Sequence, residues 1–81
     1  MIDDQTRIAA LHILRYLLDH PAAADTVEGV HFMWIGPESA YLSLDVTQAA
    51  LELLLEQGLV ACVPIGSRLL WRARRNSAAL G

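Results

Sequence analysis

The fold is decided by residues 46–60, which read VTQAALELLLEQGLV. Asp45 precedes this stretch and Gln48 follows three residues later, a spacing that forms a capping box and predicts the first turn of a helix. Gly58 predicts the end of that helix, because glycine readily adopts the left-handed conformation found after a helix C-terminus. The apolar, β-branched residues that follow favour a strand. The stretch therefore predicts a helix over residues 45–57 that leads directly into a β-strand.

A β-hairpin is predicted for the residues after this helix. Residues 64–67, which read PIGS, have turn chemistry, and the pattern after them alternates. One face of the second strand would carry Leu69, Trp71 and Ala73, and the other would carry Arg68, Leu70, Arg72 and Arg74. We expect one face of the hairpin on the core and a largely basic face in water.

A first helix is predicted over residues 4–19. Asp3 or Asp4 caps its start, and it ends before Pro21, because the residue before a proline is pushed out of the helical region. Apolar residues recur along it at helical spacing, and we expect them to face the core. They are Ile8, Leu11, Leu14 and Leu18, with Ile13 and Leu17 widening the stripe.

A shorter helix is predicted over residues 25–35. Asp25 and Glu28 form a second capping box, and a Gly-Pro pair stops the helix, so that residues 38–44 become a connector. Trp34 and Trp71 are expected in the core or at its edge, because aromatic side chains bury large areas. The alternative for Trp34 is a partly exposed anchor for a partner.

The predicted helix over residues 45–57 has an apolar and a polar side. Its inward stripe is expected to consist of Val46, Ala50, Leu53 and Leu54, and its outward arc of Asp45, Gln48, Glu52 and Glu56. Leu51 and Leu55 fall outside the inward stripe. Either the hairpin covers them or they form an apolar ridge for a partner.

Length and composition indicate one domain. The chain has 81 residues, 54% of them hydrophobic, and we expect a single domain over residues 1–75 with a flexible tail over residues 76–81. Charged residues interrupt the apolar stretches well short of the roughly 20 residues that a bilayer requires. The N-terminus is acidic where a signal peptide is positively charged. Cys62 is the only cysteine, which favours a reducing, cytoplasmic setting.

Charge is divided unequally along the chain. Residues 1–57 carry a net charge of −7 and residues 58–81 a net charge of +4, with every basic residue an arginine. The basic groups of the C-terminal part are Arg68, Arg72, Arg74 and Arg75. Guanidinium groups bind phosphate in a bidentate manner, so one interpretation of this end is an anion-binding surface. The other is a solvated face whose arginines pair with the acids of the helix over residues 45–57.

The sequence contains no pattern typical of catalysis or metal binding. His12, His20 and His31 have no partner at a ligand spacing, whereas zinc requires three or four converging ligands. Cys62 lies among apolar residues, which predicts a small buried side chain rather than a nucleophile. We therefore expect no enzymatic activity, no metal, no cofactor, no small-molecule substrate and no membrane partner.

Three helices followed by a two-stranded hairpin, together with the step from residues 46–57 through Gly58-Leu59-Val60, resemble the winged helix-turn-helix family. The stretch DTVEGV at residues 25–30, followed by Trp34, resembles a group of small bacterial proteins. The first resemblance implies a mainly α fold, a three-helix core plus a wing. It also implies that the third helix enters the DNA major groove and that the wing contacts the backbone.

Two functions follow as hypotheses. The leading one is double-stranded DNA binding or transcription-linked regulation, with the hairpin arginines as the main contact and Thr47 and Gln48 on the third helix as a secondary one. The carboxylates of Asp45, Glu52 and Glu56 on the outward arc argue against recognition of DNA bases by this helix, because phosphates repel them. The alternative is docking of a protein or of a second copy through Trp34, Leu51, Glu52, Leu55 and Glu56.

Overall fold

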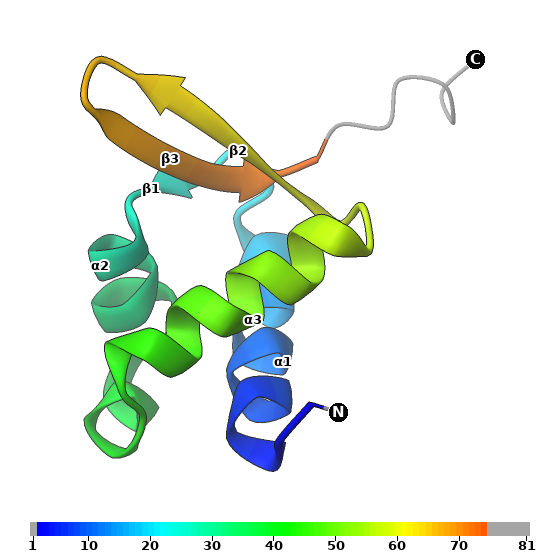
Figure 1. Cartoon of the computed structure of the whole chain (residues 1–81), viewed down its shortest axis with the longest axis vertical. Coiled ribbons are helices and arrows are strands. Elements are labelled where there is room, and N and C mark those ends of the chain that lie inside the picture. The colour runs from blue at the N-terminus through cyan, green and yellow to red at the C-terminus, as the bar shows by residue number, and fades with distance from the viewer. Residues whose placement is uncertain (1, 75–81) are drawn as a thin grey trace.

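A computed structural model describes residues 2–74 of the chain. Arg75 and the predicted tail over residues 76–81 lie outside this range. The described part is a mixed α/β fold with helices below a three-stranded antiparallel sheet (Figure 1). Its elements are α1 (Asp4–Asp19), β1 (Ala24–Asp25), α2 (Val27–Gly29), η1 (Val30–Ile35), η2 (Gly36–Tyr41), α3 (Leu44–Glu56), β2 (Val60–Ile65) and β3 (Arg68–Ala73).

Helix α1 has the predicted bounds but a different orientation. The Asp3 carboxylate caps it by accepting a hydrogen bond of 2.7 Å from the Thr6 amide. The buried side chains are Thr6, Ala9, Ala10, Ile13 and Leu17. The predicted inward residues Ile8, Leu11 and Leu18 are exposed instead, so that part of the prediction was wrong. Apolar residues surround this helix, and its alanine-bearing side is the one that packs inward.

The second helical region departs from a regular α-helix. Thr26 rather than Asp25 caps it, with the Thr26 hydroxyl accepting from the Gly29 amide at 3.3 Å. The predicted capping box was wrong because Asp25 belongs to β1, and its carboxylate accepts from the Thr26 amide at 2.8 Å. After one α-helical turn the backbone widens into the π-helix η1, and it then tightens into the 3₁₀-helix η2 in place of the predicted connector.

Helix α3 is rotated from its predicted position. It begins one residue earlier, because the Ser43 hydroxyl accepts from the Val46 amide at 3.1 Å, and it ends before Gly58, whose φ of 76° is left-handed as expected. Its buried residues are Thr47, Ala50, Leu51 and Leu54, whereas Val46 and Leu53 are only half-buried. The prediction that Leu51 lies outside the inward stripe was therefore wrong.

The sheet contains the predicted hairpin and one additional strand. In the hairpin Cys62 pairs with Trp71, and β1 joins the other edge of β3 with Asp25 opposite Trp71, giving the order β1-β3-β2. Two residues of β1 are too short to produce an alternating pattern in the sequence. Trp71 is buried as predicted, but Leu69, which was also expected to face the core, is exposed.

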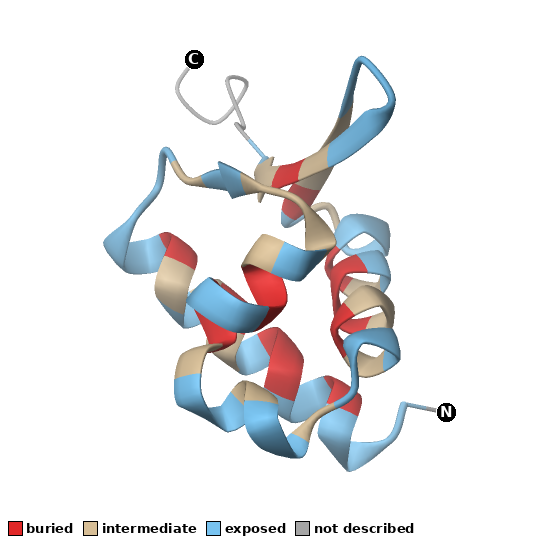
Figure 2. Ribbon diagram, turned by 90° about the vertical axis from the view of Figure 1, so that its left-hand side faces the viewer, coloured by how far each residue is buried: buried red, intermediate tan, exposed pale blue. Residues whose placement is uncertain are grey.

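The core lies where the helices face one another and the underside of the sheet (Figure 2). Trp34 is buried in it as expected, and its ring stacks on Tyr16 with centroids 5.2 Å apart. The far end of the hairpin stands clear of the core and is exposed (Figure 2). None of the helices within residues 2–74 is long and apolar enough to cross a membrane.

Candidate functional site

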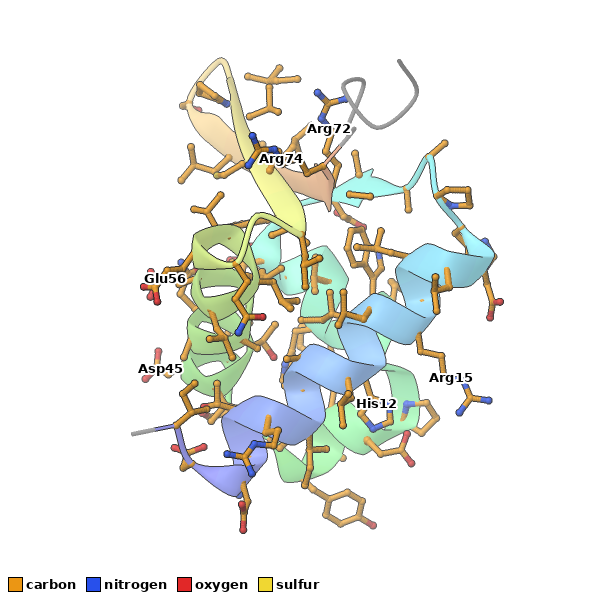
Figure 3. All side chains as sticks on the ribbon, turned by 90° about the vertical axis from the view of Figure 1, so that its right-hand side faces the viewer. His12, Arg15, Asp45, Glu56, Arg72 and Arg74 are labelled. Atoms are coloured by element: carbon orange, nitrogen blue, oxygen red, sulfur yellow. The ribbon has the colours of Figure 1, made fainter. Side chains whose placement is uncertain are left out.

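The outward side of α3 carries a row of acidic groups. We define the acidic face as Asp45, Gln48, Glu52 and Glu56, which recur every three or four residues and therefore share one side of the helix. The three carboxylates are exposed, and Gln48 donates a hydrogen bond of 3.0 Å to Glu52. Figure 3 shows Asp45 and Glu56 pointing away from α3 on the same side. The acidic face agrees with the predicted outward arc.

A groove separates the N-terminus of α1 from α3. Its lining consists of Ile2, Asp3, Thr6, Ala49, Glu52, Leu53 and Glu56, and we call it the N-terminal groove. Apolar side chains and three carboxylates therefore share one depression. The hydrogen bond from the Thr6 backbone lowers the pKa of the Asp3 carboxyl from its ordinary 3.8, so this group is charged at neutral pH.

A second groove lies between α2, α3 and the hairpin. Its lining consists of Thr26, Val27, Glu28, Gln48, Ser67, Arg68, Leu69 and Trp71, and we call it the hairpin groove. It brings together Gln48 and Arg68, two of the residues predicted to bind nucleic acid. Its polar rim mixes Glu28 with Arg68, so the charges at this groove have both signs.

Thr47, the other predicted base-contacting residue on α3, is not available to a partner. Its side chain is completely buried, and its hydroxyl oxygen lies 2.7 Å from the Nδ1 atom of His31. The prediction was wrong because the rotation of α3 turns this position into the core. His31 thus pairs with a residue of another helix, α3.

Some of the residues predicted for protein docking are buried and the others are exposed. Trp34 and Leu51 are buried and belong to the core, which corrects their assignment to a docking surface. Glu52, Leu55 and Glu56 are exposed on α3, as that hypothesis requires.

The hairpin arginines lie in a line rather than in a cluster. Arg68 at the start of β3 and Arg74 directly after its end are exposed, roughly 20 Å apart at about 3.3 Å per residue. Arg72 lies between them and is half-buried, and its Nε atom has no hydrogen-bond partner within the described chain. Figure 3 places Arg72 and Arg74 beside the hairpin, away from the acidic face.

Apolar residues separate these arginines on the outer face of the sheet. Strand pairing places Ala61 opposite Arg72, Val63 opposite Leu70, and Ile65 opposite Arg68. The outer face is therefore more apolar than the largely basic face predicted from β3 alone, because β2 contributes three apolar side chains to it. Arg75, the remaining predicted arginine, lies outside the described residues.

With this geometry established, the chain was compared with known proteins. No protein-family model, curated protein or solved structure matches it.

Within residues 2–74 no group of three or more His, Cys, Asp or Glu side chains is placed to hold a metal ion. Cys62 is half-buried opposite Trp71, and His20 lies against Tyr16 with ring centroids 4.4 Å apart.

The N-terminal groove includes residues that the sequence did not single out. Asp3 was recognised only as a helix cap, and Ile2 and Ala49 had no assigned role. The groove forms because α1 packs along α3, which brings residues 2–6 next to residues 49–56. The sequence indicates only the α3 side of the groove, where Ala49 and Leu53 lie one turn apart beside Glu52 and Glu56; no local pattern indicates the contact with residues 2–6.

Proposed function

We propose that this chain is a non-catalytic module that binds a positively charged, amphipathic segment of a partner protein. The observation that carries the proposal is the N-terminal groove, where Asp3, Glu52 and Glu56 surround apolar side chains. A segment with lysine or arginine on one side and leucine-like residues on the other would satisfy both parts of this lining. The acidic face extends the same charge along α3.

The order of elements supports a winged helix-turn-helix arrangement for this module. The strand β1 follows α1, the helical elements α2, η1, η2 and α3 follow β1, and the hairpin then pairs with β1 in the order β1-β3-β2. In such an arrangement β2 and β3 form the wing and α3 occupies the place of the DNA-reading helix. Winged helices serve both DNA and proteins, so the choice rests on the side chains of α3.

Those side chains favour a protein partner. Burial of Thr47 leaves Gln48 as the one uncharged polar group on the acidic face, and the Glu52 carboxylate already accepts a hydrogen bond from it. Phosphates would be repelled by the carboxylates around it. Exposed ion pairs each contribute about 0.2–1 kcal/mol, so charge supplies selectivity and association rate. The apolar side chains in the groove supply most of the affinity.

The proposal is tested by mapping amide chemical shifts during titration with a short amphipathic peptide of lysine and leucine. We expect the largest changes at Ala49, Glu52 and Leu53. A peptide with glutamate in place of lysine is the matched control and should leave these amides unmoved. Equal responses to both peptides, or no response to either, would reject the proposed binding surface.

Duplex binding by the hairpin is the second candidate. Arg68 on β3 and Arg74 just after it are exposed, and the half-buried Arg72 lies between them, opposite Ala61. Contacts of this kind would follow the phosphate backbone rather than read bases. Titration of the protein with a mixed-sequence DNA duplex, followed by amide chemical shifts, distinguishes the two candidates. Duplex binding by the hairpin would shift the amides of β3 and leave those of Ala49, Glu52 and Leu53 in the N-terminal groove unchanged.

A further inference from the structure

Helix α1 has a second apolar row on the side that faces away from the core. Its exposed fractions are 46% at Ile8, 61% at Leu11 and 82% at Leu18. Asp4 and Arg15 complete the row, which we call the outer row of α1. The spacing alternates between four and three residues. This alternation is the heptad pattern by which two helices pack along a common seam.

The outer row is accessible along its length. Figure 3 shows α1 crossing the front of the molecule with no other element over it, and with Arg15 extending from it into solvent. A shallow depression lies among Ile8, Leu11, His12 and Arg15. A second groove includes Leu18 of the outer row and is lined by apolar residues, namely Leu14, Leu17, Leu18, Leu59 and Ala73. Contiguous apolar surface of this kind marks a binding surface in soluble domains.

We propose that the outer row of α1 binds the same row of a second copy of this chain, with the two helices antiparallel about a two-fold axis. Charge fixes the orientation. A parallel pair would place Asp4 beside Asp4 and Arg15 beside Arg15, which is repulsive. An antiparallel pair brings each Asp4 opposite Arg15 of the second copy, and the symmetry forms this ion pair twice.

The same charges fix the register. With Asp4 opposite Arg15, Ile8 lies opposite Leu11 of the second copy. The four layers between residues 4 and 15 therefore join apolar side chains or opposite charges, and Leu18 lies beyond the paired layers. A shift by one heptad would place Leu11 opposite Arg15 and leave Asp4 without a partner. The seam is short, since the 16 residues of α1 span about 24 Å. We therefore expect a reversible dimer that depends on protein concentration.

Sedimentation velocity over a series of protein concentrations tests the dimer directly. The wild type should shift from monomer to dimer, and Leu11→Asp should remain monomeric. Leu69→Asp is the matched control, because Leu69 is similarly exposed but lies on the hairpin, and it should dimerise like the wild type. A wild type that stays monomeric, or a dimer lost with Leu69→Asp and kept with Leu11→Asp, would overturn the proposal. Circular dichroism confirms that each variant is folded.

Charge exchange tests the orientation. Arg15→Asp alone and Asp4→Arg alone should each weaken self-association about tenfold, because two ion pairs become two repulsions. Mixing these two variants should restore the wild-type dissociation constant, since every Asp then lies opposite an Arg across the heterodimer. A mixture that associates no better than either variant alone would exclude the antiparallel pairing.

Disulfide cross-linking tests the register in a Cys62→Ser background. Ile8→Cys mixed with Leu11→Cys should form a cross-linked heterodimer on mild oxidation. Ile8→Cys mixed with Leu18→Cys, which corresponds to the shifted register, should not. Preferential cross-linking of the second mixture would contradict the proposed seam. None of these three α1 experiments changes a residue that lines the N-terminal groove, so a negative result in any of them would leave the proposed function intact.

Discussion

The Nδ1 atom of His31 lies 2.7 Å from the hydroxyl oxygen of Thr47, and both side chains are buried. This contact joins η1 to α3 across the core. It also helps to fix the rotation of α3, because an unpaired imidazole or hydroxyl in this position would be costly. With Thr47 directed inward, the carboxylates of Asp45, Glu52 and Glu56 are directed outward. The acidic character of the exposed side of α3 thus follows from a buried polar pair.

Thr47→Val should lower the free energy of unfolding by about 1–3 kcal/mol, because it leaves the buried imidazole of His31 without its partner. Thr47→Ser keeps the hydroxyl and should cost less. Urea denaturation of both variants measures the difference. If valine at this position proved as stable as the wild type, the hydrogen bond would not be a determinant of the α3 orientation.

Leu54→Ala should cost about 2–5 kcal/mol, because Leu54 is fully buried where α3 meets the rest of the core. The adjacent Leu55 is 43% exposed, and its replacement by alanine should cost little. Leu53→Ala should fall between the two. Thermal denaturation of the three variants checks the rotation of α3, and an order reversed between Leu54 and Leu55 would show that the helix is turned differently.

Acid should weaken the N-terminal cap of α1. Because the folded-state pKa of Asp3 is lowered by its hydrogen bond from Thr6, its stabilising effect is present above the ordinary value of 3.8 and is lost as the pH falls through the folded-state pKa. Asp3→Ser retains a neutral cap. Urea denaturation at pH 7 and pH 3 should show a smaller loss of stability in this variant than in the wild type. Identical losses would argue against the charged cap.

Duplex binding by the hairpin, where detected, should depend weakly on salt. The basic end of the chain carries four arginines, Arg68, Arg72, Arg74 and Arg75, so the slope of log K against log salt concentration should be no steeper than about −4. Replacing Arg68, Arg72 and Arg74 together by alanine should abolish the binding. Fluorescence anisotropy with a labelled mixed-sequence duplex measures both quantities, and a much steeper slope would require contacts beyond this strand.

Local signals in the sequence were sufficient for most element bounds. Asp3, Gly58 and the alternation after residue 67 act within one turn or one strand, and they placed α1, the end of α3 and the hairpin correctly. The facing of the helices was harder to predict, because Leu51, Leu53, Leu54 and Leu55 surround α3 with apolar groups. The choice among them depends on tertiary contacts with α1, η1 and β2.

The candidate site was partly predictable for the same reason. Glu52 and Glu56 were expected outside from their spacing, and they are exposed. Thr47 was misplaced, because its polarity suggested solvent whereas its partner, His31, lies on another element. The N-terminal groove was missed, since it joins the first residues of α1 to α3 and no local pattern specifies that contact.

Charge reversal on the acidic face distinguishes a basic protein segment from a DNA duplex as the partner. The dissociation constant of the lysine-leucine peptide should be measured by fluorescence anisotropy for the wild type and for Glu52→Lys/Glu56→Lys, with a mixed-sequence duplex titrated in parallel. Asp19→Lys/Glu38→Lys is the matched control, because it changes the net charge equally at exposed acids away from the N-terminal groove. We predict that the wild type binds the peptide in preference to the duplex. Glu52→Lys/Glu56→Lys should raise the dissociation constant of the peptide by about tenfold or more. The control variant should bind the peptide as the wild type does. Tighter binding of the duplex by the wild type, with peptide binding unchanged by Glu52→Lys/Glu56→Lys, would contradict the account.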